Sequence, residues 1–451
     1  GGGGGSHSAG SNDKISPPDS PFSLPPALVI STSEPLGTPP FSSPLRAPMS
    51  APTTPMMSFA AAPGVGASGR RDWRRNFVEK AFKANRKIEY LHGTQCRETH
   101  EVHDVMEEAI LALEEGIKPH LVEDGLGGTY FLKDRDGASI AVFKPRDEEP
   151  LAPNNPKVHA GQGKGVGLKE GVLVGDASIS EYAAFLLDQA SSPHLQAGVC
   201  PTALVRVQDS VFHSAKERRH TAFRIIKDKV GSFQLFAKHD CTSEDMGPAR
   251  YPDEQVHRIA VLDIRLCNTD RHSGNILVRQ GEGKDLQLVP IDHGYALPGE
   301  VGGATFEWLR WPAARRPFSE EMKREILAID PKDVEAALKR RVPALREECL
   351  ITLRVCTVFL QRGVEAGLTA FDIGDMMTRP DEDYGDDVRD SAGDDRSGSR
   401  GPMPHTPSVF ERLIADAKRQ QVKASDDADI PEQILDGLIR ARCCQMVETR
   451  E

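Results

Sequence analysis

The string Asp270-Arg271-His272-Ser273-Gly274-Asn275 carries the strongest chemical signal in this chain of 451 residues. Its aspartate and asparagine stand five positions apart, which is the spacing in the catalytic loop of kinases. In such a loop the aspartate faces the acceptor hydroxyl and the asparagine binds a metal ion. A second string, Pro290-Ile291-Asp292-His293-Gly294, places an aspartate at the end of an expected strand. Asp292 thus has the position of the metal-binding aspartate that kinases carry before Phe-Gly.

Together the two strings predict a phosphotransferase centre. We expect Asp270 to orient the acceptor hydroxyl, and we expect Asn275 and Asp292 to hold Mg²⁺ through oxygen atoms, the ligands that this ion prefers. Taken one at a time, each string can also be a polar turn between strands. His272 is expected to shape the loop, because the histidines of this region lack the spacing of zinc ligands on one helix.

Upstream of both strings, an apolar strand ends on a lysine, in Ala141-Val142-Phe143-Lys144-Pro145. A charged group in such surroundings ordinarily requires a partner of opposite charge. Glu181, on a helix expected over 178–189, can provide it, as in the strand-lysine to helix-glutamate pair of kinases. The alternative is a lysine that reaches solvent from an edge strand and an unrelated surface glutamate. Lys144 precedes the two strings in the order found in kinases. It therefore favours the kinase interpretation, in which its ammonium group contacts the phosphates of ATP.

A glycine cluster, Gly125-Leu126-Gly127-Gly128, precedes an expected hairpin of strands 129–132 and 140–144. Glycine permits positive φ and close approach, so the backbone N–H groups of this segment can cover phosphates. Taken alone, such a cluster is more often a plain hairpin turn. The candidate contacts to ATP are Gly127, Gly128 and Thr129.

Longer strings give a more specific pattern. They are Phe143-Lys144-Pro145-Arg146-Asp147-Glu148-Glu149-Pro150, Asn154-Asn155-Pro156, Asp263-Ile264-Arg265-Leu266-Cys267-Asn268-Thr269 leading into the first string above, Ile291-Asp292-His293-Gly294, and Phe306-Glu307-Trp308-Leu309-Arg310-Trp311-Pro312. Together they resemble the plant gamma-group, type II phosphatidylinositol 4-kinases. The resemblance runs from about 125 to 379.

This resemblance implies an α+β, two-lobed kinase-like fold, the phosphoinositide 3/4-kinase catalytic domain, with a small β-rich N-lobe and a helical C-lobe. It also implies that Lys144 contacts the phosphates of ATP, that Glu181 pairs with it, and that Gln234-Leu235-Phe236-Ala237 forms the adenine-binding hinge, with Gln234, Phe236 and Ala237 as contacts. The implied reaction is that of a 1-phosphatidylinositol 4-kinase. Such an enzyme transfers the γ-phosphate of ATP, with Mg²⁺, to the 4-hydroxyl of phosphatidylinositol in a membrane surface.

The chain departs from its apparent relatives in ways that leave alternatives open. Animal type II enzymes carry a palmitoylated cysteine-rich stretch that this chain lacks, and residues 1–75 cannot form the ubiquitin-like modules of many plant relatives. Some gamma-group members phosphorylate protein hydroxyls, so a protein serine/threonine kinase on the same scaffold is one alternative. A pseudokinase scaffold is another, although it would not need the full set of catalytic groups. A metal-dependent phosphohydrolase leaves the lysine-bearing strand unexplained.

Composition and periodicity divide the chain into expected segments. Val102, Met106, Ile110 and Leu113 recur at helical spacing, which predicts an amphipathic helix before the kinase domain. We expect further strands over 202–208, 232–237, 276–279 and 286–291, and further helices over 256–266 and within 319–378. The segments are a disordered Pro/Ser/Ala-rich tail at 1–75, a helical lead-in at 76–120, the N-lobe at 121–237, the C-lobe at 238–379, an acidic flexible insert at 380–407 and a C-terminal helical tail at 408–451.

Overall composition excludes several classes of protein. The 38% hydrophobic residues suffice for a full core, and the net charge of -11 argues against a protein that neutralises nucleic-acid phosphates. Eight cysteines without a CxxC pair, and no secretory signal, indicate a reducing, cytoplasmic compartment. No stretch approaches the roughly 20 apolar residues of a transmembrane segment, so we expect peripheral contact with membranes.

Two further features have alternative interpretations. Trp308 and Trp311 can form a ledge that contacts a membrane, but aromatic residues followed by proline more often close a core, which we favour. Cys443-Cys444 follows an apolar helical face and can be acylated, although an ordinary reduced pair at a helix end is the simpler interpretation.

Overall fold

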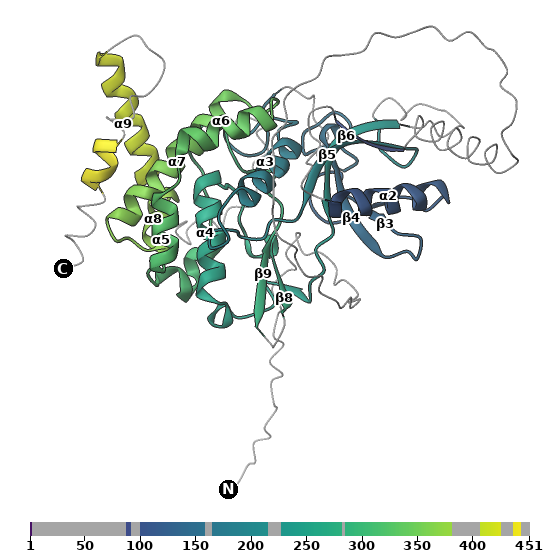
Figure 1. Cartoon of the computed structure of the whole chain (residues 1–451), viewed down its shortest axis with the longest axis horizontal. Coiled ribbons are helices and arrows are strands. Elements are labelled where there is room, and N and C mark those ends of the chain that lie inside the picture. Colours follow the sequence, from purple (N-terminus) through teal and green to yellow (C-terminus); the bar gives the residue numbers. More distant parts are fainter. Residues whose placement is uncertain are drawn as a thin grey trace, which may run out of the picture.

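The computed structural model describes residue 1 and residues 87–91, 100–157, 165–214, 227–281, 285–380, 406–424 and 436–442. Residues 2–75 of the expected tail, residues 381–405 of the expected insert, and Cys443-Cys444 lie outside these ranges. The first part of the described chain is rich in strands and the later part is mainly helical (Figure 1). The prediction of an α+β fold with a β-rich N-lobe and a helical C-lobe is therefore confirmed.

Six strands of the N-lobe form one antiparallel sheet in the order β1-β5-β6-β4-β3-β2. Along β4, Ala141 and Phe143 are buried, whereas Val142 and Lys144 point to the opposite face, as the two-residue period of a strand requires. Lys144 therefore leaves the core of its own lobe. The bounds of the strands are β1 Ile88–Tyr90, β2 His120–Leu121, β3 Tyr130–Lys133, β4 Ser139–Pro145, β5 Thr202–Asp209 and β6 Lys227–Leu235.

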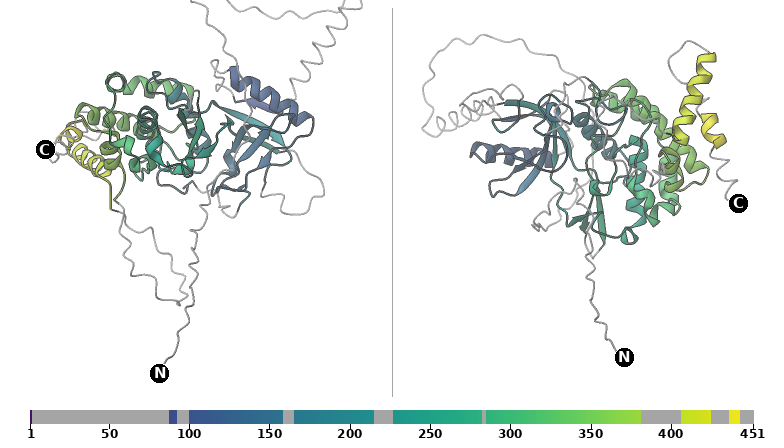
Figure 2. Two further views of the ribbon diagram at one scale, coloured as in Figure 1. Left: turned by 90° about the horizontal axis from the view of Figure 1, so that it is seen from below. Right: turned by 180° about the vertical axis from the view of Figure 1, so that it is seen from behind.

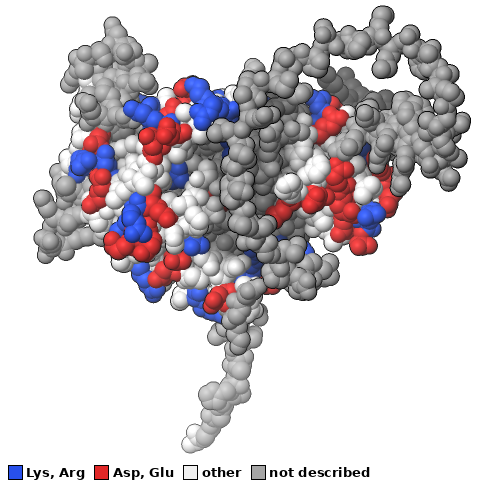
Figure 3. Space-filling model, viewed as in Figure 1, with Lys and Arg blue, Asp and Glu red and all other residues white. Residues whose placement is uncertain are grey.

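Helix α2 (His100–Glu114) packs against β3, β4 and β6. Its apolar residues recur at helical spacing, and Val102, Met106 and Leu113 are buried against Phe143 and Phe233 of the sheet. Acidic side chains gather on the solvent side of this helix (Figure 3). The amphipathic helix that the sequence predicts therefore covers one face of the N-lobe sheet.

The C-lobe is built around α7, which contacts α4, α5, α6 and α8. A small antiparallel sheet, β7-β8-β9, lies beside α4. Helix α3 packs against β5 and β6 and also against α6, so it joins the two lobes (Figure 2). The bounds are α3 Ala177–Gln189, β7 Cys241–Thr242, α4 Asp253–Leu266, β8 Ile276–Gln280, β9 Leu286–Pro290, α5 Glu320–Leu327, α6 Pro331–Arg341, α7 Glu347–Glu365, α8 Ala370–Met377 and α9 Val409–Ala424.

The structure has three short strands that the sequence does not predict. β1 lies in the segment expected to be helical, β2 spans the end of that segment at residues 120 and 121, and β7 lies in the C-lobe. All three are edge strands of two or three residues, too short to show a period. β6 begins at Lys227, earlier than expected, because this polar start of the strand pairs with the end of β5.

Trp308 and Trp311 are almost fully buried in the C-lobe core. The core interpretation of the two tryptophans is therefore right and the membrane ledge is wrong. Among the described helices, none has the length and apolar composition that crossing a bilayer would require.

Candidate active site

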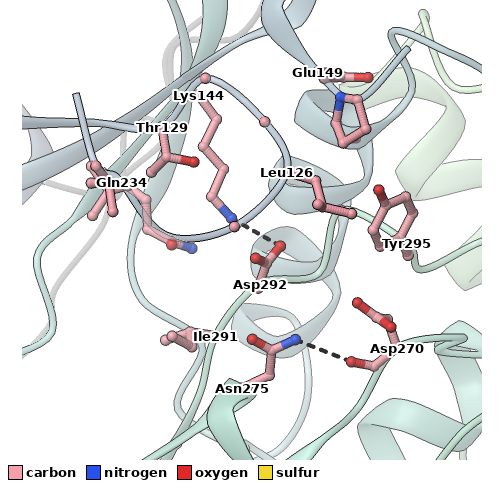
Figure 4. Close-up of a pocket in the computed structure, with 18 of the residues that line it drawn as sticks. Leu126, Thr129, Lys144, Glu149, Gln234, Asp270, Asn275, Ile291, Asp292 and Tyr295 are labelled. Carbon is pink, nitrogen blue, oxygen red and sulfur yellow. Dashed lines mark hydrogen bonds and ion pairs between the residues drawn. The ribbon is translucent and has the colours of Figure 1, made fainter. Parts of the chain in front are cut away.

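A cleft of about 330 Å³ contains the residues that the sequence singles out (Figure 4). The glycine segment and β4 line it from the N-lobe, and the string around Asp270 and the string around Asp292 line it from the C-lobe. The end of β6 and the loop that leads into α3 complete the wall. Among its lining residues are Gly127, Gly128, Thr129, Lys144, Gln234, Phe236, Ala237, Asp270, Asn275 and Asp292.

Lys144 is the central cation of the cleft. Its Nζ lies 2.5 Å from Oε1 of Glu181 on α3 and 2.9 Å from Oδ1 of Asp292. Burial by itself would lower the pKa of Lys144, but the charges of Asp292 and Glu181 outweigh it and raise that pKa above its ordinary value. Burial also opposes ionisation of Glu181, yet Lys144 and then His293 hold its pKa below the ordinary range. Lys144 therefore remains charged, with one carboxylate behind it and another facing the cleft.

The backbone at Asp292 fixes the direction of its carboxylate. Its φ is +54°, in the left-handed region that residues other than glycine rarely adopt. The preceding residue, Ile291, donates its N–H to the carbonyl of Asn275 at 3.0 Å. This contact ties the Asp292 string to the end of the Asp270 string, so the two predicted metal ligands are held side by side.

Asp270 and Asn275 lie opposite Lys144 in the cleft (Figure 4). The Nδ2 group of Asn275 donates to the backbone carbonyl of Asp270 at 3.1 Å, which leaves the amide oxygen as its acceptor. The N–H of Asp270 donates to Oδ1 of Asn268. Backbone contacts therefore position Asp270, and its carboxylate pairs with Nζ of Lys169 at 2.8 Å.

A buried charge cluster beneath the cleft supports both strings. The fully buried Arg271 donates to both carboxylate oxygens of Asp263 on α4. It also donates to the carbonyls of Asn275 and Ile291, at 2.7 and 2.6 Å. Trp308 donates its indole N–H to Asp263 at 3.0 Å. Arg271 thus joins the backbone next to both predicted metal ligands to the core of the C-lobe.

The glycine segment is held by the loop that follows β4. Gly128 donates its N–H to the carbonyl of Glu148 at 2.8 Å, and a Cβ at this position would lie 2.6 Å from Oε2 of Glu148. Asn155 donates to the carbonyl of Leu126 at 2.9 Å. The amide of Gly128 is therefore already used, and its role is close packing. Among the predicted contacts, Gly127 and Thr129 remain as the candidates for phosphate binding.

The segment expected to be the hinge lines the far end of the cleft. Apolar side chains from both lobes face it: Val142 from β4, and Leu277 and Ile291 from the C-lobe. The ring of Phe236 meets Phe131 edge-on, with 5.3 Å between centroids. Gln234 is turned to Thr202, to which its side-chain amide donates at 3.1 Å. This end of the cleft is an apolar slot of the kind that suits a flat heterocycle.

The donor set at the other end suits Mg²⁺. In the part of the chain that the structure describes, no group of three or more His, Cys, Asp or Glu side chains could hold a metal ion. Asn275 and Asp292 offer an amide oxygen and a carboxylate. Mg²⁺ commonly takes only one or two protein carboxylates and completes its octahedron with phosphates and water. Asn275 and Asp292 therefore fit a metal ion whose other ligands are nucleotide phosphates and water.

Comparison with known proteins decides the family. Residues 125–373, more than half of the chain, match the sequence model described as phosphatidylinositol 3- and 4-kinase. The chain belongs to the phosphatidylinositol 3- and 4-kinase family. This family match confirms the resemblance found in the sequence.

Similar proteins within this family carry a narrower name. Phosphatidylinositol 4-kinase gamma 6 of Arabidopsis thaliana is 44% identical over 286 residues, which are 60% of this chain and 44% of that protein. Phosphatidylinositol 4-kinase gamma 4 of Oryza sativa subsp. japonica is 44% identical over 62% of this chain and 48% of that protein. For phosphatidylinositol 4-kinase gamma 8 of Arabidopsis thaliana, the identity is 39% over 73% and 58%. The chain thus spans about half the length of the curated relatives it matches.

Sequence reasoning missed four residues of this kinase-family site. Asp263 and Arg271 stand in the quoted strings, but charged residues on a helix and in a loop look like surface residues until their partners are known. Lys169 lies in a glycine-rich loop without periodicity, where the sequence offers no signal. Glu149 is buried and accepts the N–H groups of Gly175 and Ser178 at the start of α3. Its position directly before a proline gave no indication of that role.

Glu149 predicts a pH dependence of stability in this protein. Burial raises its pKa from near 4.5 to about 7, although backbone N–H groups oppose the change. Between these values the folded chain holds a proton that the unfolded chain has released, so the unfolding free energy falls as the pH rises. The glutamine of Glu149→Gln does not titrate, so the variant should lack this pH-dependent part of the unfolding free energy, which is roughly 3 kcal/mol at most. Thermal unfolding at several pH values should therefore show a smaller fall in melting temperature for the variant between about pH 5 and pH 8. Parallel curves for the two proteins would contradict this assignment.

Proposed function

We propose that the chain is a 1-phosphatidylinositol 4-kinase, which uses Mg²⁺ and ATP to phosphorylate the 4-hydroxyl of phosphatidylinositol at a membrane surface. One observation carries the proposal. Lys144 forms ion pairs with Glu181 and Asp292, and it faces Asp270 and Asn275 across a single cleft. The names of the similar proteins support lipid as the acceptor. We further propose that the protein acts in the cytoplasm, peripherally at membranes.

Each group in the cleft has a part in this mechanism. Lys144 neutralises phosphate charge, and its bond to Glu181 fixes the ammonium group in place. Asn275 and Asp292 would hold Mg²⁺, which when bound supplies further positive charge against the phosphate oxygens. The apolar slot beside Phe236 receives the base, and Gly127 and Thr129 cover the phosphates.

Asp270 acts on the acceptor. The hydroxyl oxygen forms a bond to the γ-phosphorus while the bond from that phosphorus to the β–γ bridging oxygen breaks. ADP leaves with the electron pair of the broken bond, and the hydroxyl proton passes to the Asp270 carboxylate. Backbone contacts hold Asp270 independently of its side chain, so the carboxylate can face the acceptor while it pairs with Lys169.

Product identity tests the proposal. The full chain is incubated with γ-labelled ATP, Mg²⁺, phosphatidylinositol vesicles and a mixture of generic protein substrates, and lipid and protein are then separated. We expect label in the lipid, at the 4-position after head-group analysis. Label only in protein would identify a protein kinase on this scaffold. Release of inorganic phosphate without a labelled acceptor would identify a phosphohydrolase, and no turnover at all would identify a pseudokinase.

Two exposed hydrophobic side chains at the entrance support contact with a membrane. Val166 and Leu168 are 72% and 42% exposed, and they flank Gly167 in the loop whose residues 167–169 line the cleft beside Asp270. An antiparallel bridge between Val166 and Leu173 fixes the conformation of this loop. A lipid head group that reaches Asp270 would bring the bilayer surface close to these side chains, and apolar side chains bind at that interface.

Replacing both side chains should separate membrane contact from catalysis. Val166→Asn/Leu168→Asn should lower the rate on phosphatidylinositol vesicles about tenfold, the effect of losing roughly 1.4 kcal/mol of interfacial binding. The rate on a water-soluble short-chain phosphatidylinositol should fall much less, although Leu168 lines the cleft. Leu327→Asn is the matched control, because Leu327 is 42% exposed but does not line the cleft. Equal losses on both substrates would rule out a role restricted to the membrane.

A further inference from the structure

The carboxylate of Asp270 already has a cationic partner from another part of the chain. Nζ of Lys169 lies 2.8 Å from its Oδ1 and 6.0 Å from the centre of the Tyr295 ring. Lys169 belongs to the loop that leads into α3, and both Lys169 and Tyr295 line the cleft. A lysine from outside all the recognised strings therefore stands at the point where the acceptor hydroxyl must arrive.

The loop that carries Lys169 is fixed to the C-lobe on its far side. The carbonyl of Gly171 accepts the N–H of Gly299 at 2.8 Å and a guanidinium N–H of Arg346 at 2.9 Å. Gly171 has a φ of +73°, and a Cβ there would lie 2.9 Å from the backbone nitrogen of Glu300. The loop thus meets the C-lobe backbone too closely for any residue but glycine.

The neighbour of Lys169 is fixed as well. Glu170 pairs with Arg379 at 2.7 Å, and Arg379 also binds Glu411 on α9. Glu411 in turn accepts the N–H of Ser408 at the start of that helix. These contacts hold residues 170 and 171 against Gly299, Arg346 and Arg379, so the position of Lys169 beside Asp270 is determined by the fold.

The other cations close to this site have partners of their own. Lys144 is bonded to Glu181 and Asp292, and Arg271 is fully buried against Asp263. Among the described residues, Lys169 is the cation that contacts the Asp270 carboxylate. Its side chain is 37% exposed, so it can shift towards a bound group without breaking a core contact.

We propose that Lys169 is a catalytic residue, which bridges Asp270 and the phosphoryl group during its transfer. The inference rests on the proposed function, because it concerns the same γ-phosphate. In that reaction the Asp270 carboxylate and the γ-phosphate must approach the same hydroxyl, and two negative groups at such a distance repel each other. An ammonium group between them offsets this repulsion and stabilises charge on the equatorial oxygens of the phosphoryl group. Lys169 keeps its proton throughout, while the hydroxyl proton passes to Asp270.

Binding of a transition-state analogue tests this role without any acceptor. ADP, Mg²⁺ and aluminium fluoride together mimic the phosphoryl group in transfer, so wild-type protein should bind ADP more tightly when fluoride is present. Lys169→Met should bind ADP and ATP within about threefold of wild type. The increase in ADP affinity that aluminium fluoride causes should be about 100-fold smaller in this variant, and kcat should fall by a similar factor. Lys169→Arg, which retains the charge, should recover much of both. Lys339→Met is the matched control, since Lys339 lies on the surface, where it pairs with the exposed Glu347.

Several results would overturn the proposal. Undiminished tightening by aluminium fluoride in Lys169→Met would show that Lys169 does not touch the phosphoryl group. A higher kcat would show that the lysine merely blocks Asp270. An equal loss of ADP affinity together with a lower melting temperature would make Lys169 structural. If wild-type protein binds the analogue but labels no lipid, the lipid assignment fails while the test of Lys169 still stands.

Discussion

Asp270→Ala should reduce phosphate transfer by about a thousandfold or more, while ATP binds within about threefold of its affinity for wild-type protein. The reason is that the backbone and the side chain of this residue have different roles. The N–H and carbonyl of Asp270 hold Asn268 and Asn275, and both contacts survive the loss of the carboxylate. Removing the side chain should therefore leave the nucleotide site assembled and take away the group that we propose receives the acceptor proton.

Single-turnover transfer from labelled ATP and equilibrium binding of ATP would measure the two effects separately. Asp253→Ala is the matched control, because Asp253 also has a cationic partner, Arg316, but does not line the cleft. This control should retain wild-type values for both quantities. Comparable turnover in the Asp270 variant, or a large loss of ATP affinity, would show that Asp270 is not the acceptor-facing group.

Arg271→Met should lower the free energy of unfolding by about 3 to 5 kcal/mol. The substitution leaves the fully buried Asp263 carboxylate without its cation, and it leaves the carbonyls of Asn275 and Ile291 without the guanidinium donors. Uncompensated buried charge is among the costliest defects in a folded protein. Because both carbonyls adjoin predicted metal ligands, the folded fraction of this variant should also bind ATP and Mg²⁺ more weakly.

Denaturant unfolding of full-length variants checks this value. The surface pair of Arg316 with Asp253 provides the control, and Arg316→Met should leave the free energy of unfolding close to that of wild type, because solvent screens that pair. Combining Asp263→Leu with Arg271→Met removes both charges, so it should cost less than the sum of the single changes. Simple additivity would show that the two buried groups do not act as a pair.

The sequence predicts the parts of this fold that have a strong local period. The hairpin of β3 and β4 follows from strand alternation and a turn, and α2 follows from the helical spacing of its apolar residues. The short strands β1 and β2 could not be predicted in this way. β1 pairs with β5, which is distant in the chain, and both strands are too short, at three and two residues, to show a period.

The same limit applies to the site. Lys144, Asp270, Asn275 and Asp292 stand at spacings that the chemistry of phosphate transfer imposes, so their convergence in one cleft could be predicted from the sequence. Lys169 could not be predicted, because a glycine-rich loop of irregular conformation places it. Its position depends on Gly171 meeting the backbone of the C-lobe, which is a matter of packing between distant segments.

The role that the sequence suggests for Gly128 differs from the one in the structure. A glycine before a strand suggests an N–H group that is available to phosphates, whereas here that N–H group donates to the carbonyl of Glu148. Glu148 is fully buried, and it accepts the hydroxyl of Tyr130 at 2.6 Å and pairs with Lys229 at 3.0 Å. No short motif contains such a network, because its members come from three separate segments of the chain.

The proposed mechanism requires a strand lysine and three C-lobe side chains to converge on one triphosphate. A crystal structure of the full chain with a non-hydrolysable ATP analogue and Mg²⁺ tests this requirement most directly. We expect the phosphates beside Nζ of Lys144, the metal on oxygens of Asn275 and Asp292, and the γ-phosphorus facing the Asp270 carboxylate. A nucleotide bound outside this cleft, or a metal held without Asp292, would contradict the mechanism.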